Sequence, residues 1–132
     1  MLSTPAGVVD LEHGKLIEAS REMYCTMQTV VAPEEGEHPL FDTVVERVAQ
    51  GDADVREYLW RALGYCITGD VRLEIFFYLR GAENSGKGTL IKAISEIMGD
   101  YAKTVSIEAF IEQKNPRHSQ ELARLRNARL VH

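Results

Sequence analysis

Apolar residues recur at intervals of three and four in three stretches of this chain, and that spacing predicts three amphipathic helices. Gly51 ends the first stretch and Gly99 ends the third, as glycine commonly does after a helix. Asp52 or Asp54 is placed to cap the second helix, because Glu57 follows Asp54 at the interval of a capping box. The apolar positions are Leu40, Phe41, Val44, Val45 and Val48 in the first stretch, Val55, Tyr58, Leu59, Ala62, Leu63 and Cys66 in the second, and Leu90, Ile91, Ile94, Ile97 and Met98 in the third.

Other apolar runs have the composition of strands. Residues 73–79 are apolar, aromatic and β-branched without interruption, which is typical of a strand buried on both faces. Two short runs on either side of His13-Gly14 predict a β-hairpin, and residues 23–32 predict a third N-terminal strand closed by Pro33. Further along, the sequence predicts strands at 102–105 and 128–132, brief helices at 107–111 and 119–125, and a basic loop at 114–118.

The segment from Gly81 to Thr89 lies between the predicted strand 73–79 and the third helix. It contains the spacing G-x-x-x-x-G-K, and a strand, this loop and a helix in that order are the context of a phosphate-binding P-loop. Glycines allow backbone N–H groups to approach an anion closely, and the start of the helix adds its own unpaired N–H groups. We therefore expect an α/β fold with a P-loop NTPase core at 71–132, preceded by a β-rich accessory segment at 1–38 and a helical layer at 39–70.

This loop is also the predicted nucleotide site. Lys87 would bring a full charge to the β- and γ-phosphates of ATP, where charge grows during phosphoryl transfer, and is the predicted catalytic residue. Gly88 stands where the usual motif has the Ser or Thr that holds Mg²⁺, so Thr89, one place later, or a water would serve the metal. The predicted cofactor-binding residues are Gly81, Asn84, Ser85, Gly86, Lys87, Gly88 and Thr89, and the predicted cofactors are ATP and Mg²⁺.

Composition narrows the class of protein without identifying it. The chain has 132 residues, 45% hydrophobic and 27% charged, as in an ordinary globular domain. No apolar run is long enough to span a membrane, and Cys25 and Cys66 are expected to be small core residues of a reduced, cytoplasmic protein. Net charge is −5, with 5 Lys or Arg against 13 Asp or Glu in residues 1–70 and 6 against 3 in residues 101–132. The C-terminal cations Arg117, His118, Arg124, Arg126 and Arg129 are candidates for contact with DNA or nucleotide.

Several stretches outside the loop carry a family resemblance. They are Gly7-Val8-Val9-Asp10-Leu11 with Gly14, then Leu63-Gly64-Tyr65-Cys66-Ile67-Thr68-Gly69-Asp70, then Gly99-Asp100-Tyr101-Ala102, and finally residues 118–131. Together with the loop, their order resembles the helicase part of phage and plasmid primase–helicases, superfamily III helicases of the AAA+ type. The resemblance covers the chain from about residue 4 to its last residue.

The resemblance implies an ATP-driven DNA helicase of phage or prophage replication that assembles as a homo-oligomeric ring. It also implies that this chain is the N-terminal accessory part plus the first half of an AAA+-like core. In that family, acidic metal-binding residues, a polar sensor and an arginine finger come later than His132, and a primase domain comes earlier. On this basis the 132-residue chain alone is expected to bind ATP or ADP weakly and not to unwind DNA.

Two other interpretations stay open from the residues alone. Gly-Lys-Gly-Thr also occurs in small P-loop nucleotide kinases, although here the loop lies beyond residue 80 and no Arg-rich lid follows. Alternatively, the chain is a non-catalytic nucleotide-binding or oligomerisation module. A phosphoryl-acceptor assay with nucleoside monophosphates would identify a kinase, and ATP-independent assembly would favour the module.

Overall fold

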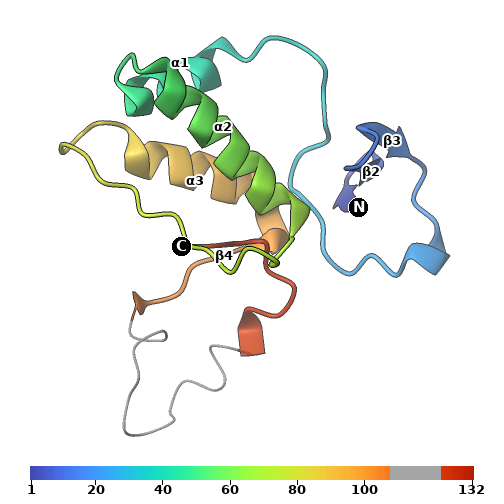
Figure 1. Ribbon diagram of the computed structural model, residues 1–132. Helices are drawn as coiled ribbons and strands as arrows, with labels where there is room; N and C mark the ends of the chain where they lie inside the picture. Colours follow the sequence, from blue (N-terminus) through green and yellow to red (C-terminus); the bar gives the residue numbers. More distant parts are fainter. Residues whose placement is uncertain (108–122) are drawn as a thin grey trace, which may run out of the picture.

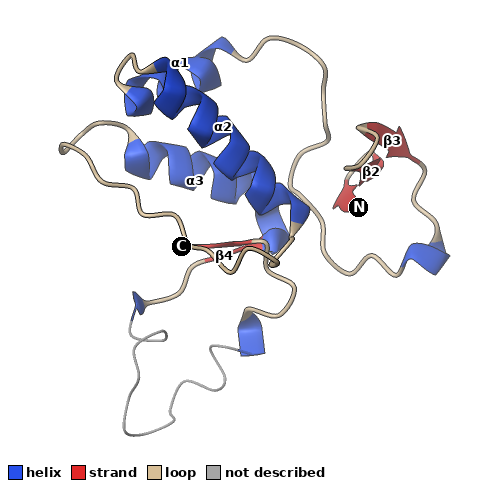
Figure 2. Cartoon of the chain, in the orientation of Figure 1, coloured by secondary structure: helices blue, strands red, loops and turns tan. Residues whose placement is uncertain are grey.

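A computed structural model describes residues 1–107 and 123–132. Three helices pack together, and a small sheet formed by the N-terminus lies beside them (Figure 1). The strands fall into two separate groups, a three-stranded sheet and a two-stranded pair (Figure 2). In chain order the elements are β1 (Leu2–Thr4), β2 (Gly7–Asp10), β3 (Lys15–Ile17), the 3-10 turn η1 (Arg21–Met23), α1 (Pro39–Ala49), α2 (Ala53–Thr68), α3 (Lys87–Met98), the 3-10 turn η2 (Gly99–Tyr101), β4 (Ala102–Lys103) and β5 (Leu130–Val131).

The N-terminal sheet confirms the predicted hairpin. Its antiparallel order is β1-β2-β3, with Val9 opposite Leu16 across the hairpin. Strand β1 was not predicted, because three residues are too few to show an alternating pattern. Val8 is fully buried, and Leu2 joins the core of the helical part, so the sheet is attached to the helices through side chains.

The predicted strand at 23–32 is wrong. Residues 21–23 form η1, and the chain then runs on without a ladder. Thr29 N–H donates to Ser3 O at 3.0 Å, whereas Val30 N–H donates to Ile97 O at 3.0 Å. Because these two neighbours bond to different elements, the segment acts as a connector between β1 and α3 and cannot form a continuous strand.

The helical layer is confirmed. Asp52 is the cap of α2, since its carboxylate accepts from Asp54 N at 2.9 Å and Val55 N at 3.1 Å. The core is built from Val45 and Ala49 of α1, Leu59 and Leu63 of α2, and Leu90, Ile94 and Met98 of α3. Of the apolar positions of the three predicted helices, Leu40, Val55, Tyr58 and Ile97 are exposed, so the apolar stripes are only partly buried.

The last two strands also confirm predictions, in shortened form. β4 and β5 pair in parallel, with Ala102 opposite Leu130. Hydrogen bonds from His132 N to Lys103 O and from Val105 N to His132 O continue the pairing beyond Lys103 and Val131. The predicted helix at 107–111, the basic loop at 114–118 and most of the helix at 119–125 fall on residues 108–122, outside the described residues.

The predicted buried strand at 73–79 is wrong. Asp70 and Arg72 pair side chain to side chain, and Glu74 N–H donates to Val71 O, which makes a turn where the strand should begin. The rest of the segment pairs with no described strand, and Phe76 is 87% exposed. A strand needs backbone partners to form a ladder, and the short β4–β5 pair does not supply one here. Phe77 makes edge contacts to the rings of Tyr58 and Tyr65 of α2, and Leu73 N–H donates to the Tyr65 hydroxyl at 3.4 Å.

The cysteines agree with prediction only in part. Cys66 is half-buried, and burial raises the pKa of its thiol, which keeps it protonated and unreactive. Cys25 is exposed, so its predicted core position is wrong. Among the described residues, no helix combines the length and the apolar character needed to cross a bilayer.

Candidate functional site

The candidate site is the loop from Gly81 to Thr89, which leads into α3. Gly86 is the residue before the helix, and its carbonyl accepts the first helical hydrogen bond from Leu90 N at 2.9 Å. None of the described side chains caps this helix end. The first-turn N–H groups of α3 therefore have no acceptor within the helix, and with the helix dipole they favour an anion.

Lys87 is folded back over the loop. Its ammonium donates to Gly81 O at 3.1 Å, to Ala82 O at 2.7 Å and to Ser85 Oγ at 2.8 Å. These three bonds use all three ammonium donors and draw both ends of the loop around one positive charge. The sequence prediction placed Gly81, Ser85 and Lys87 in one site, and the structure brings these three together.

Two loop residues have left-handed backbone geometry. Asn84 has φ 58° and Gly86 has φ 90°. Such residues, alternating with right-handed ones, turn successive N–H groups toward a common side of the loop, an arrangement that binds anions. A Cβ at Gly86 would lie in ordinary contact with Val48 at 3.4 Å and Arg47 at 3.6 Å of α1, so it is the positive φ that favours glycine here.

Gly88 and Thr89 lie in the first turn of α3 and are both exposed. Thr89 offers one hydroxyl oxygen, and the described residues include no group of three or more His, Cys, Asp or Glu side chains able to hold a metal ion. One hydroxyl is too few ligands for Mg²⁺, which takes six oxygens. The residues present therefore do not by themselves form a magnesium site.

The approach of α1 side chains to the loop was not predicted from the sequence. Gln50 Nε2 lies 3.9 Å from the Cβ position of Gly81, and Arg47 lies beside Gly86. Both come from the last turn of α1 or just after it, and α1 and α3 pack on each other. Only the packing of two helices that are separated by more than 35 residues brings these side chains to the loop, so no local sequence signal could have found them.

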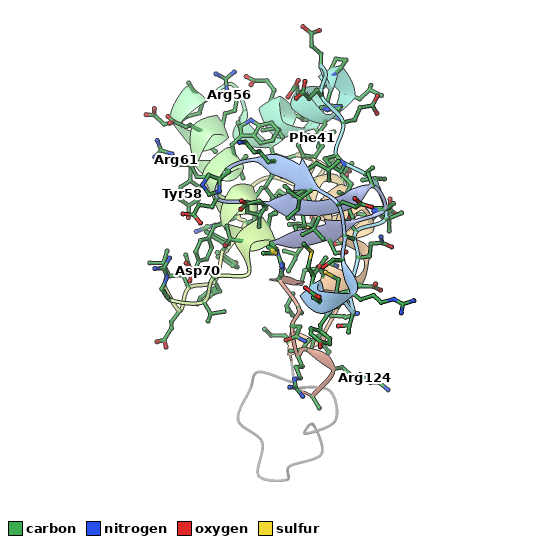
Figure 3. The ribbon with its side chains drawn as sticks, turned by 90° about the vertical axis from the view of Figure 1, so that its right-hand side faces the viewer. Phe41, Arg56, Tyr58, Arg61, Asp70 and Arg124 are labelled. Carbon is green, nitrogen blue, oxygen red and sulfur yellow. The ribbon has the colours of Figure 1, made fainter. Side chains whose placement is uncertain are left out.

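Of the predicted C-terminal cations, the structure describes Arg124, Arg126 and Arg129. Arg129 is engaged within the protein: it donates to Ile67 O at 2.6 Å and to Met1 O, and its guanidinium lies 4.5 Å from the centre of the Tyr101 ring. Arg124 lies on the far side of the molecule from α1 (Figure 3), and Arg117 and His118 are outside the described residues. Neither Arg124 nor Arg129 is therefore placed at the loop.

Comparison with known proteins gives two sequence matches. Residues 1–50 match the family described as "D5 N terminal like". A protein of Acanthamoeba polyphaga mimivirus named "Putative helicase" is 30% identical over 66 residues, which are 50% of this chain and 7% of that protein. No solved structure matches.

These matches bear out the resemblance at a coarse level. The family match covers the N-terminal sheet and α1, so it ends before the loop at residues 81–89. The chain spans only a small part of the mimivirus protein. Together, the two findings support a relation to viral helicases.

Proposed function

We propose that residues 81–89 bind the phosphates of ATP, and that this chain is the ATP-binding part of a DNA replication helicase. The observation that carries the proposal is the closure of the loop around Lys87 at the uncapped start of α3. In this loop a polyphosphate would meet first-turn N–H groups, left-handed backbone and a full positive charge within one short segment. The relation to a viral helicase supports the proposed link to DNA. Assembly as a ring is proposed from the family resemblance alone.

Nucleotide binding would require Lys87 to exchange partners. Its ammonium now donates to two carbonyls and one hydroxyl, which are neutral acceptors. A phosphate oxygen is charged, and hydrogen bonds to charged acceptors are roughly twice as strong as those between neutral groups. The exchange is therefore favourable, and the carbonyls of Gly81 and Ala82 hold the side chain near the place where a phosphate would lie.

The test compares ATP binding by the wild-type chain, Lys87→Ala and Lys92→Ala in isothermal titration calorimetry with MgCl₂. Lys92 is a matched control, because it lies on the same helix, carries the same charge and is 77% exposed beside Glu96. We expect Lys87→Ala to weaken binding at least tenfold, the loss of about 1.5–3 kcal/mol for a charged hydrogen bond, and Lys92→Ala to change it less than twofold. Equal affinities for the three proteins, or no heat with the wild type at millimolar ATP, would contradict the proposal.

A further inference from the structure

A hollow of about 780 Å³ adjoins the phosphate loop. One wall is the face of α1 from Asp42 to Gln50, and the other is formed by Arg56 and Trp60 of α2. Arg56 and Trp60 are four residues apart, so they lie on the same face of the helix. Figure 3 shows Arg56 and Phe41 toward the opposite end of the molecule from Arg124.

Two side chains lie beside both the hollow and the loop. Arg47 and Gln50 line the hollow, and the same two side chains lie beside Gly86 and Gly81 of the loop. From this end the hollow follows α1 back from Gln50 toward Asp42, a length of about 12 Å at the helical rise of 1.5 Å per residue. A ligand with phosphates on the loop would therefore reach the hollow by way of Arg47 and Gln50.

Trp60 gives the hollow an aromatic surface. Its indole is 45% exposed, and Phe41 holds it in place with ring centroids 5.4 Å apart at an angle of 56°. Buried tryptophans fill cores, but a half-exposed indole fixed by a second ring presents a flat apolar surface to whatever enters the hollow.

The hollow is positively charged at its loop end and carries both acidic and basic side chains farther along α1. Arg47 lies at the loop end, where it adds positive charge near Lys87. Asp42, Thr43 and Glu46 lie farther along α1 and supply oxygen acceptors, while Arg56 pairs with Glu46 at 3.4 Å. This order suits a molecule that is anionic at one end and carries hydroxyl and N–H donors on a flat ring at the other.

We propose that this hollow holds the base and ribose of the nucleotide, with the base stacked on Trp60. The proposal rests on the proposed function, because it takes the phosphates to lie on residues 81–89. A nucleoside matches the chemistry of the site: the base offers a flat π-surface and N–H donors, and the ribose offers hydroxyls to the acidic side chains. Stacking of a base on an aromatic side chain contributes about 1–3 kcal/mol per base.

A second hollow fits a nucleoside less well. It runs along α3 between Gly88 and Ser95 and is closed by Ala102, Thr104 and His132. It reaches the phosphate loop only at Gly88, and neither a Phe, Tyr or Trp ring nor an arginine lines it in the described structure. The hollow at Trp60 has both, and is the site we assign to the base.

The test uses the fluorescence of Trp60, which is the single tryptophan of the chain. The wild-type protein is titrated with ATP and, separately, with inorganic tripolyphosphate, each with MgCl₂, while calorimetry measures both affinities. We expect ATP to quench the emission of Trp60 saturably and tripolyphosphate to bind without quenching, because only ATP carries a base. Trp60→Ala should weaken ATP binding roughly 5- to 150-fold, which corresponds to the stacking energy above, and should leave tripolyphosphate binding within twofold.

Two further variants guard against a folding artefact. Trp60→Phe keeps an aromatic surface and should retain most of the affinity for ATP. Tyr24→Ala removes an exposed aromatic ring outside the hollow and should not change either affinity. Circular dichroism checks the fold of each variant, and the wild-type fluorescence comparison needs no variant.

The outcomes separate the two proposals. If tripolyphosphate binds but ATP does not quench Trp60 and binds no more tightly, the base lies elsewhere and this inference is wrong while the phosphate site stands. The same holds if Trp60→Ala weakens both ligands equally. If neither ligand binds to the wild-type protein, the proposed function fails and this inference fails with it.

Discussion

The hydroxyl of Tyr101 joins three parts of the chain, so its removal tests how the N-terminal sheet is held to the helices. It accepts a hydrogen bond from Ser3 N of β1 at 3.1 Å and donates one to Met27 O at 3.0 Å. Tyr101 is 7% exposed and Ser3 is also buried, so water cannot easily replace the lost partner. Tyr101→Phe removes this one oxygen and keeps the ring on which the Arg129 guanidinium lies.

The loss of stability on Tyr101→Phe comes from the two backbone groups that lose their hydrogen-bond partner. A buried donor or acceptor without a partner costs about 1–3 kcal/mol, and Tyr101→Phe leaves the Ser3 N–H and the Met27 carbonyl unpaired. Because the Met27 carbonyl is less buried and can bond to water, we expect a total of about 2 kcal/mol. For a chain of this size that lowers Tm by about 8 °C, at about 4 °C per kcal/mol.

Urea denaturation followed by circular dichroism measures the free energy of unfolding, and amide hydrogen exchange at Ser3 reports the local effect. Tyr58→Phe is the matched control, because the Tyr58 ring is 59% exposed and its hydroxyl has no hydrogen bond to the described residues. It should stay within about 0.5 kcal/mol of the wild type. A Tyr101→Phe protein as stable as this control, with unchanged exchange at Ser3, would refute the reasoning.

Three further predictions test the core, a helix cap and a surface ion pair. Leu90→Ala should lower the free energy of unfolding by about 2–5 kcal/mol in urea titrations, since Leu90 is 1% exposed at the centre of the helical core and its loss leaves a cavity; Leu40→Ala, at an 85% exposed position, is its control. Asp52→Ala should cost about 1 kcal/mol by thermal unfolding, because two N–H groups of α2 lose their acceptor. Hydrogen bonds from Arg72 lower the pKa of Asp70. The stabilisation that these bonds give the folded protein is present above the ordinary pKa of Asp and is lost as pH falls through the lower pKa of Asp70 in the folded state. Arg72→Ala should raise the pKa of Asp70 in an NMR titration, and an unchanged pKa would contradict the ion pair.

The sequence alone determined the features that depend on neighbours in the chain. Helix periodicity predicted α1 and α2 correctly, and of the two predicted caps, Asp52 and Asp54, the structure has Asp52. Both signals depend on residues within one or two turns. The His13-Gly14 turn predicted the β2–β3 hairpin for the same reason. The candidate loop was also readable, since its glycines and Lys87 lie within nine consecutive residues.

Tertiary structure decided what depends on partners far away in the chain. The run 73–79 has the composition of a buried strand, yet strand formation requires a neighbouring backbone, and the described structure pairs it with none. Arg129 was a candidate for nucleic-acid contact by charge, but its guanidinium is engaged with Met1, Ile67 and Tyr101. The approach of Arg47 and Gln50 to the loop, and of Trp60 to the adjoining hollow, comes from the packing of α1 against α2 and α3. Periodicity identifies the face of a helix that is buried, whereas the identity of its neighbour is fixed only when the helices pack.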